Sequence, residues 1–390
     1  MLMAFTVSCE ILDDDPDRHA AGGVYVSPAE VAEVLSGLPL GQDQMREVFT
    51  AVTASAVNGY DEEYTMSDLF VSPGSGVGDD RGQETRSAVK GVPLRDMIET
   101  HLKSALPVRS SCPIPDPDAW LDYVAKSDMQ IYWPFSESWD GVSLPVITFD
   151  PEDDSDVNVG YRIVADQDGG HRIEQVLVDE SMAEDVPVWI VNRNTDAGYT
   201  TLEMLRKEDP EWGTGGGGII VSPDTGTKSG RHFKSLMLKD FTMHRNYDSW
   251  FAGASEFFVK VGSVEDFTAS TEAELKIFNP MVTDFLVVVR RGQKGVSVPF
   301  NAVLVSEWTE SLESVAFMII EDDGGTVKDW NCTALVRVES KSYGVELKIP
   351  YRSSDDIVWR GSLTWKWFEA NSNVVGHFGD VDLTFEVLEY

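Results

Sequence analysis

The chain has 390 residues, 42% of them hydrophobic, and its 66 acidic and 31 basic side chains give a formal net charge of −35. This hydrophobic fraction excludes a disordered chain. The charge excludes nucleic acid as a partner, because it repels phosphates. The length predicts two or three domains, since one core rarely serves so many residues. No apolar stretch reaches the ~18 residues that span a bilayer.

The N-terminal stretch carries a possible targeting signal. Residues 1–9 form a short apolar run that ends in small residues and Cys9, and residues 10–17 are strongly acidic. The run resembles the end of a bacterial lipoprotein signal peptide, although it lacks a basic start and has Thr6 where Leu is usual. The acidic stretch resembles the surface-export signal of Bacteroidetes lipoproteins. The resemblance implies that Cys9 is lipidated, that residues 1–23 are signal and tether, and that the protein lies on the outer-membrane surface. The alternative is an ordinary N-terminus with an unmodified Cys9.

Residues 24–110 have the pattern of a short helical region. Ser27 is a favourable N-cap, Pro28 suits the first helical position, and Glu30 completes a capping box. Apolar residues at helical spacing predict two further helices, over residues 42–57 and 94–106. Three Pro residues within 111–119 then indicate a linker.

Residues 120–212 are predicted to form a mixed α/β or all-β region. Alternation of apolar and polar residues predicts its strands. They cover residues 145–149, 159–165, 172–178 and 187–192. A run of four glycines within the following residues, 213–230, predicts a linker.

Residues 231–390 are predicted to form an antiparallel β-sandwich, because apolar runs recur every ten to fifteen residues with little helix between them. The last four alternating runs, which include Trp365 and Trp367 on one apolar face, are read as strands. The start of this region, around residues 238–240 and 256–259, loosely resembles the first hairpin of a C2-like sandwich. The chain as a whole is therefore predicted to be multi-domain and mainly β.

One acidic loop has the spacing of a calcium site. Asp154, Asp156 and Asn158 alternate, and Asp153 precedes them. An EF-hand is excluded, because its glycine and its final glutamate are missing, so only weak calcium binding is expected and no other cofactor. The run Glu321-Asp322-Asp323-Gly324-Gly325 is similar, but its glycines favour a hairpin turn.

No catalytic motif is evident. The histidines lack metal-ligand spacing, and acidic residues are too numerous for a catalytic pair to be chosen. Trp330 and Trp359, placed beside Asp and Asn in expected loops, are candidates for ligand binding. The sequence favours a non-catalytic surface lipoprotein that binds a glycan, a peptide or an envelope protein. The alternative is a surface hydrolase, directed at glycosides or peptides, with unidentified acidic catalytic residues.

The lipid anchor is directly testable. Mass spectrometry of the protein from its native membrane should find a diacylglyceryl group on Cys9. Cys9→Ala should release the protein in soluble form, because each buried lipid CH₂ contributes roughly 0.8 kcal/mol to membrane binding. An unmodified Cys9 thiol in the native protein would contradict the prediction.

Overall fold

The computed structural model describes residues 24–70, 91–104, 116–151, 155–165, 171–194, 199–210 and 234–389. The described residues form two compact units. The first unit comprises residues 24–54 and 63–194, and the second comprises residues 55–62 and 199–389. Among these described residues, no helix is both long and apolar enough to span a membrane.

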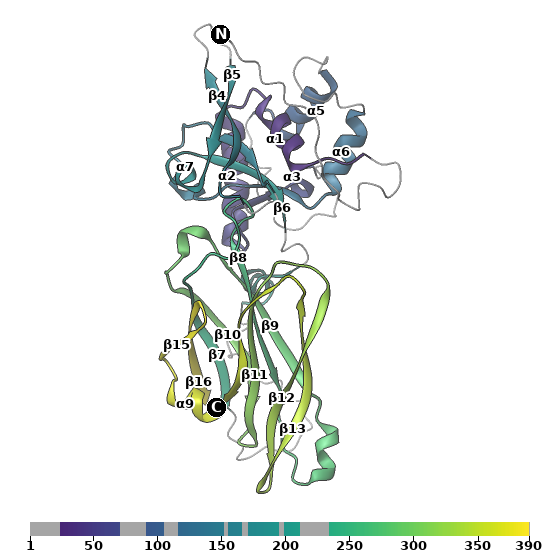
Figure 1. Cartoon of the computed structure of the whole chain (residues 1–390), viewed down its shortest axis with the longest axis vertical. Coiled ribbons are helices and arrows are strands. Elements are labelled where there is room, and N and C mark those ends of the chain that lie inside the picture. Colours follow the sequence, from purple (N-terminus) through teal and green to yellow (C-terminus); the bar gives the residue numbers. More distant parts are fainter. Residues whose placement is uncertain are drawn as a thin grey trace. The chain divides into compact units, whose positions relative to one another are not determined.

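The first unit is a mixed sheet with helices (Figure 1). Its strands follow the order β1-β2-β6-β3-β4-β5, and among these described strands only the β3–β6 pair is parallel. The strands are β1 (Glu63–Thr65), β2 (Met129–Tyr132), β3 (Val146–Phe149), β4 (Asn158–Ala165), β5 (His171–Val178) and β6 (Val188–Arg193). The helices are α1 (Pro28–Ser36), α2 (Gln42–Val57, whose last residues belong to the second unit), α3 (Met66–Phe70), α5 (Leu94–Ser104), α6 (Pro117–Lys126) and α7 (Glu180–Asp185), with the 3₁₀ turn η2 (Ser136–Ser138).

The predicted start of the first helix is confirmed. The Ser27 hydroxyl accepts a hydrogen bond from the Glu30 N–H at 3.3 Å, and the Glu30 carboxylate accepts one from the Ser27 N–H at 2.8 Å. Two orphan donors of the first turn are thereby satisfied. Helix α1 then packs against β3 and β6 and buries its apolar face in the core of this unit.

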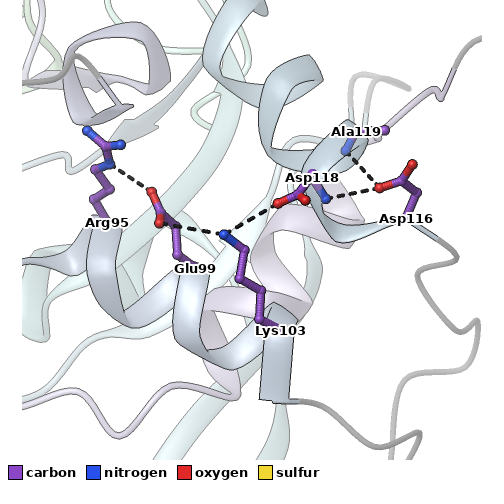
Figure 2. Close-up of polar contacts among 6 residues, drawn as sticks. All are labelled: Arg95, Glu99, Lys103, Asp116, Asp118 and Ala119. Carbon is purple, nitrogen blue, oxygen red and sulfur yellow. Dashed lines mark hydrogen bonds and ion pairs between the residues drawn. The ribbon is translucent and has the colours of Figure 1, made fainter.

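Helices α5 and α6 are linked by a chain of polar contacts (Figure 2). Glu99 accepts a hydrogen bond from Arg95 at 2.9 Å and lies 4.0 Å from Lys103, which is 3.3 Å from Asp118. The Asp116 carboxylate caps α6 by accepting bonds from two backbone N–H groups at 3.1 Å. Because Lys103 is half exposed, its ion pairs contribute little stability, and the cap contributes more.

The second unit consists mainly of two packed antiparallel sheets (Figure 1). One sheet has the order β10-β7-β16-β15, and the other has the order β13-β12-β11-β8-β9, with β14 also paired to β11. The strands are β7 (Lys234–Met243), β8 (Ser255–Ser263), β9 (Met281–Val289), β10 (Val298–Trp308), β11 (Leu312–Glu321), β12 (Val327–Val338), β13 (Lys341–Arg352), β14 (Asp356–Thr364), β15 (Val375–Phe378) and β16 (Val381–Glu389). Helices α8 (Leu202–Glu208) and α9 (Trp365–Ala370) and the 3₁₀ turns η3 (Glu272–Ile277) and η4 (Arg291–Gln293) complete it.

The mainly β architecture is confirmed, but its division differs from the one predicted. The regions 24–110 and 120–212 were expected to be separate. Instead, β1 pairs with β2, and helices from the first region share one core with strands from the second. Residues 199–210 belong with the sandwich-like second unit, as do residues 55–62. The signal and tether, residues 1–23, and the glycine-rich run lie outside the described residues.

One predicted strand segment is wrong. Trp365 and Trp367 do not extend β14 but lie in helix α9, which begins after Thr364. The Thr364 hydroxyl accepts a hydrogen bond from the Trp367 N–H at 3.3 Å and caps the helix. The alternation of Leu363, Trp365 and Trp367 is typical of a strand but is too short to impose one, and the Thr364 cap begins a helix within it.

The aromatic core of the second unit gives a stability prediction. The Phe317 side chain is fully buried, and its ring lies 5.6–5.9 Å from those of Trp359, Phe378 and Phe385. Phe317→Ala should lower the free energy of unfolding by about 3–5 kcal/mol, because it leaves a cavity. Val327→Ala, at a residue that is 74% exposed, should change it by less than about 0.5 kcal/mol. Urea denaturation of the full chain measures both, and similar losses would contradict this account of the core.

Candidate metal centre

Acidic residues from separate segments gather at one end of the six-stranded sheet of the second unit. We call them the acid cluster: Asp248 between β7 and β8, Glu256 in β8, Glu321 at the end of β11, Asp322 and Asp323 just after it, Asp355 before β14, and Asp356 at its start. Strand pairing brings them together. Glu321 lies opposite Phe257 of β8 on one side and opposite Asp356 of β14 on the other.

Asp248, Glu256 and Glu321 form the inner triad of this cluster. One carboxyl oxygen from each lies within 4.8 Å of the others. Glu321 is fully buried, Glu256 is 7% exposed, and Asp248 is partly buried. Two oxygens bound to one calcium ion are at most about 5 Å apart, since each lies 2.3–2.6 Å from the ion. The triad therefore has the spacing of a cation site.

Glu321 is the most constrained member of the triad. Neither of its carboxyl oxygens accepts a hydrogen bond from a donor among the described residues. Its side-chain contacts are with the carboxyl groups of Asp248 and Asp323. Two carboxyl groups in contact form a hydrogen bond only when one of them is protonated. Burial, followed by the charge of Asp248, raises the pKa of Glu321 well above its ordinary range.

The outer part of the cluster is partly neutralised. Arg352 Nη1 lies 3.3 Å from Asp322 Oδ2, and the Arg352 guanidinium packs 5.6 Å from the centre of the Tyr199 ring. Asp355 accepts a hydrogen bond from the Arg352 N–H at 2.6 Å. Burial, before the contact with Asp355, raises the pKa of Asp322, and Arg352 opposes this effect. Asp322 is thus paired with the Arg352 guanidinium, whereas the Glu321 carboxyl group accepts no hydrogen bond from a described residue.

The segment that carries Asp248 is held by two buried side chains. Arg291 donates hydrogen bonds to the Asp248 carbonyl at 2.5 Å and to the Gly253 carbonyl at 3.2 Å. Asp61 accepts bonds from the Ala254 N–H at 2.8 Å and the Glu62 N–H at 2.7 Å. Both side chains are at most 9% exposed. These contacts fix the position of Asp248 relative to β8.

This arrangement suits a hard divalent cation. Carboxylate oxygens are the ligands that calcium, magnesium and manganese prefer, whereas zinc and copper favour imidazole or thiolate groups. A cation within the triad would supply the positive charge that Glu321 lacks. None of the residues of the triad was singled out from sequence as a ligand. The one available signal was the acidic run that begins at Glu321, which was interpreted as a turn, and Gly324 and Gly325 do have the positive φ of one.

The predicted calcium residues that the structure describes, Asp156 and Asn158, belong to the first unit. Asp153 and Asp154 are outside the described residues, and Asp156 is exposed. Asn158 is in β4, where its amide donates to the Phe149 carbonyl at 2.8 Å and accepts from the Val159 N–H at 2.7 Å. Its oxygen is therefore already hydrogen-bonded. Calcium binding by this loop stays a prediction.

The other predicted site residues are not members of the acid cluster. Cys9 lies outside the described residues. Trp330 and Trp359 were expected in loops but lie in β12 and β14. Both are half-buried and pack against the core of the second unit, and the Trp359 ring lies 5.1 Å from that of Phe378. Ligand binding by either residue stays a prediction.

No family model matches the chain, and no similar curated protein or solved structure was found. Its functional residues are therefore inferred from geometry and chemistry.

Asp61 provides a test of the buried electrostatics beside the triad. Burial raises its pKa from 3.8 to about 6, against the effect of its two backbone donors. The folded state thus binds this proton more tightly than the unfolded state. Protonation of Asp61 therefore stabilises the folded state, fully below pH 3.8, and this contribution is lost as pH rises through about 6. The loss amounts to about 3 kcal/mol.

Asp61→Asn should therefore weaken the fall in the free energy of unfolding between pH 4 and pH 7 by about 2.4 kcal/mol, because at pH 4 the unfolded carboxyl group is already partly ionised. Urea titrations at the two pH values measure this difference. Asp329→Asn, at an exposed position of β12, is the control and should leave the pH dependence unchanged. Equal pH dependence in wild type and Asp61→Asn would show that Asp61 has an ordinary pKa.

Proposed function

We propose that the protein is a non-catalytic cell-surface protein with a binding or structural role, and that its second unit holds a calcium ion between Asp248, Glu256 and Glu321. The observation that carries this proposal is the buried Glu321 carboxyl group, which contacts acids and receives no hydrogen bond from the described residues. An isolated buried charge is strongly unfavourable. A divalent cation removes that penalty and the repulsion from Asp248 together.

Calcium fits this site better than the other common divalent ions. The triad supplies only oxygen ligands, which disfavours zinc. Magnesium requires a near-ideal octahedron at 2.0–2.1 Å, whereas calcium accepts irregular sets of six to eight oxygens. The dissociation constant should be on the order of 10⁻⁵ to 10⁻³ M, the range between calcium sensors and extracellular modules.

A surface location agrees with a site of this strength, because weak calcium sites occur in extracellular modules. The resemblance of the stretch ending at Cys9 to a lipoprotein signal supports attachment to the outer membrane through a lipid anchor. The net charge of −35 disfavours contact with nucleic acid and favours cations. A glycan, a peptide or an envelope protein is the kind of partner that we propose for such a protein.

A surface hydrolase is the second candidate, and one observation favours it. A carboxyl group whose pKa is raised by burial beside a second carboxyl group is typical of acid–base catalysts, and Glu321 beside Asp248 is such a group. Full burial of Glu321 weighs against it, because a substrate atom would have to reach a side chain that solvent does not touch.

Calcium-dependent stability tests the proposal. Calcium at 100 times its dissociation constant should stabilise the wild type by about 2.7 kcal/mol. Glu321→Gln should abolish this gain, because an amide carries no charge. In chelator the variant should be at least as stable as the wild type, since glutamine requires no proton. Thermal melts with calcium and with chelator measure both effects.

Glu346→Gln is the matched control. It makes the same change at an exposed position of β13 outside the acid cluster, and it should keep the full calcium effect. An equal calcium effect in Glu321→Gln would contradict the proposed site. Hydrolysis of a glycoside or peptide that disappears in both Asp248→Asn and Glu321→Gln would instead support the second candidate.

A further inference from the structure

Strand β5 forms an open edge of the sheet of the first unit, because β4 is its one neighbour among the described strands (Figure 1). Its eight residues, His171–Val178, pair with β4 in a continuous register without a bulge. On the other side of β5, a row of backbone N–H and C=O groups pairs with no described strand. Such a row is a template for pairing with a further strand.

The other strands at the ends of the described sheets have features that oppose such pairing. β1 has three residues and β15 has four, so each offers a very short edge. β10 contains Pro299 and three register shifts, and β13 contains Pro350, Lys341 and Lys348. β9 lies against β10 of the facing sheet. β5 has no proline, no lysine and no bulge, and it therefore lacks the usual protection against edge-to-edge association.

The side chains of β5 add an apolar surface beside this edge. Ile173 lies opposite Ile163 of β4, and Leu177 lies opposite Val159. Opposed residues point to the same face of a sheet, and here it is the face covered by α1, because Ile163 belongs to the core that α1 helps to form. Ile163 is 9% exposed, whereas Ile173 is 48% and Leu177 is 69% exposed. The apolar face thus continues beyond the buried core to the open edge.

We propose that this edge binds a second copy of the chain by antiparallel pairing of the two β5 strands, with Gln175 on the two-fold axis. A two-fold contact requires a surface that is complementary to itself. In this register Ile173 of each copy lies opposite Leu177 of the other, so that the exposed apolar side chains of both copies gather on one face. The two sheets then form one continuous sheet. This inference goes beyond the proposed function and does not depend on calcium.

The charges of β5 permit this contact, although each copy has a net charge of −35. Arg172 Nη2 lies 2.6 Å from Glu174 Oε1, so these two charges of β5 offset each other. In the proposed register Glu174 lies opposite Val176 and Arg172 lies opposite Val178, so neither meets a like charge directly. Charges more than about 8 Å from the contact are largely screened at physiological salt. Because one strand from each copy makes a small contact, a dissociation constant on the order of 10⁻⁵ M is expected.

Sedimentation equilibrium of the full chain, in buffer with chelator, measures the association. Wild type should be in equilibrium between monomer and dimer. Ile173→Lys with Leu177→Lys should raise the dissociation constant at least about tenfold, because four apolar side chains per dimer are replaced. The control, Val92→Lys with Val142→Lys, makes the same change of charge at residues of the first unit that are 57% and 67% exposed, and it should keep the wild-type constant. Both double variants are less negative than wild type, so greater overall repulsion cannot explain a weaker dimer.

A cysteine at the proposed axis tests the register independently. Gln175→Cys should form a disulfide-linked dimer on mild oxidation, because directly opposed Cβ atoms lie about 4.5–5.5 Å apart, close to the spacing of a disulfide. Glu346→Cys, at an exposed position of β13, retains the same native cysteines and should not cross-link. Equal cross-linking of the two variants would overturn the proposal. A monomeric wild type, or an unchanged dissociation constant in the Ile173/Leu177 variant, would also overturn it. Circular dichroism verifies that each variant is folded.

Discussion

A carboxylate in a protein interior stays ionised only if hydrogen-bond donors or a positive charge lie beside it. Glu321 has neither among the described residues, and its side-chain contacts are carboxyl groups. Its place is set by β11, which pairs with both β8 and β14 at this end of the sheet. The geometry of the acid cluster follows from that pairing, and the cluster must take up either a proton or a cation.

The surrounding structure keeps the inner triad from relaxing. A strand end can relieve repulsion by turning its side chains toward solvent, but Asp248 is on a segment whose carbonyls are bound by the buried Arg291. The same segment is fixed at Ala254 by Asp61, which precedes it by nearly two hundred residues. Asp61, although far away in sequence, thus helps Arg291 to hold the candidate ligand Asp248 in place. Both buried side chains therefore belong to the description of the site.

The β-strands could be predicted from the sequence because their signal is local. Alternation identified at least part of each strand from β7 to β13 and of β16, although the run within β12 covered only its end, and the capping box at Ser27 was recognisable from four residues. Failure occurred where local patterns compete. The residues around Trp365 satisfy strand alternation, yet the Thr364 cap begins a helix there. Residues 24–110 and 120–194 form one unit partly because β1 pairs with β2. A strand of three residues, such as β1, is too short to be predicted from alternation.

The acid cluster could not be predicted for a different reason. Sequence motifs select carboxylates that are close along the chain, such as Asp153 to Asp156, and the chain holds 66 acidic residues. The triad instead joins residues 248, 256 and 321, and only sheet register makes 256 and 321 neighbours. Composition could not distinguish Glu321 from other glutamates, since its distinguishing property is burial without a donor.

The burial of the Glu321 carboxyl group without a hydrogen-bond donor among the described residues is unfavourable, whereas the other features of the second unit are favourable. Its strands alternate, its aromatic core is closely packed, and its helix α9 is capped. In such a unit an unsatisfied acid lowers the stability of the metal-free protein, and sequences that retain such conflicts do so mainly at functional sites. A cation that binds only the folded state would raise the free energy of unfolding and so offset this loss of stability. Because Glu321 is at the end of β11, a cation bound there would stabilise the pairing of β11 with β8 and β14.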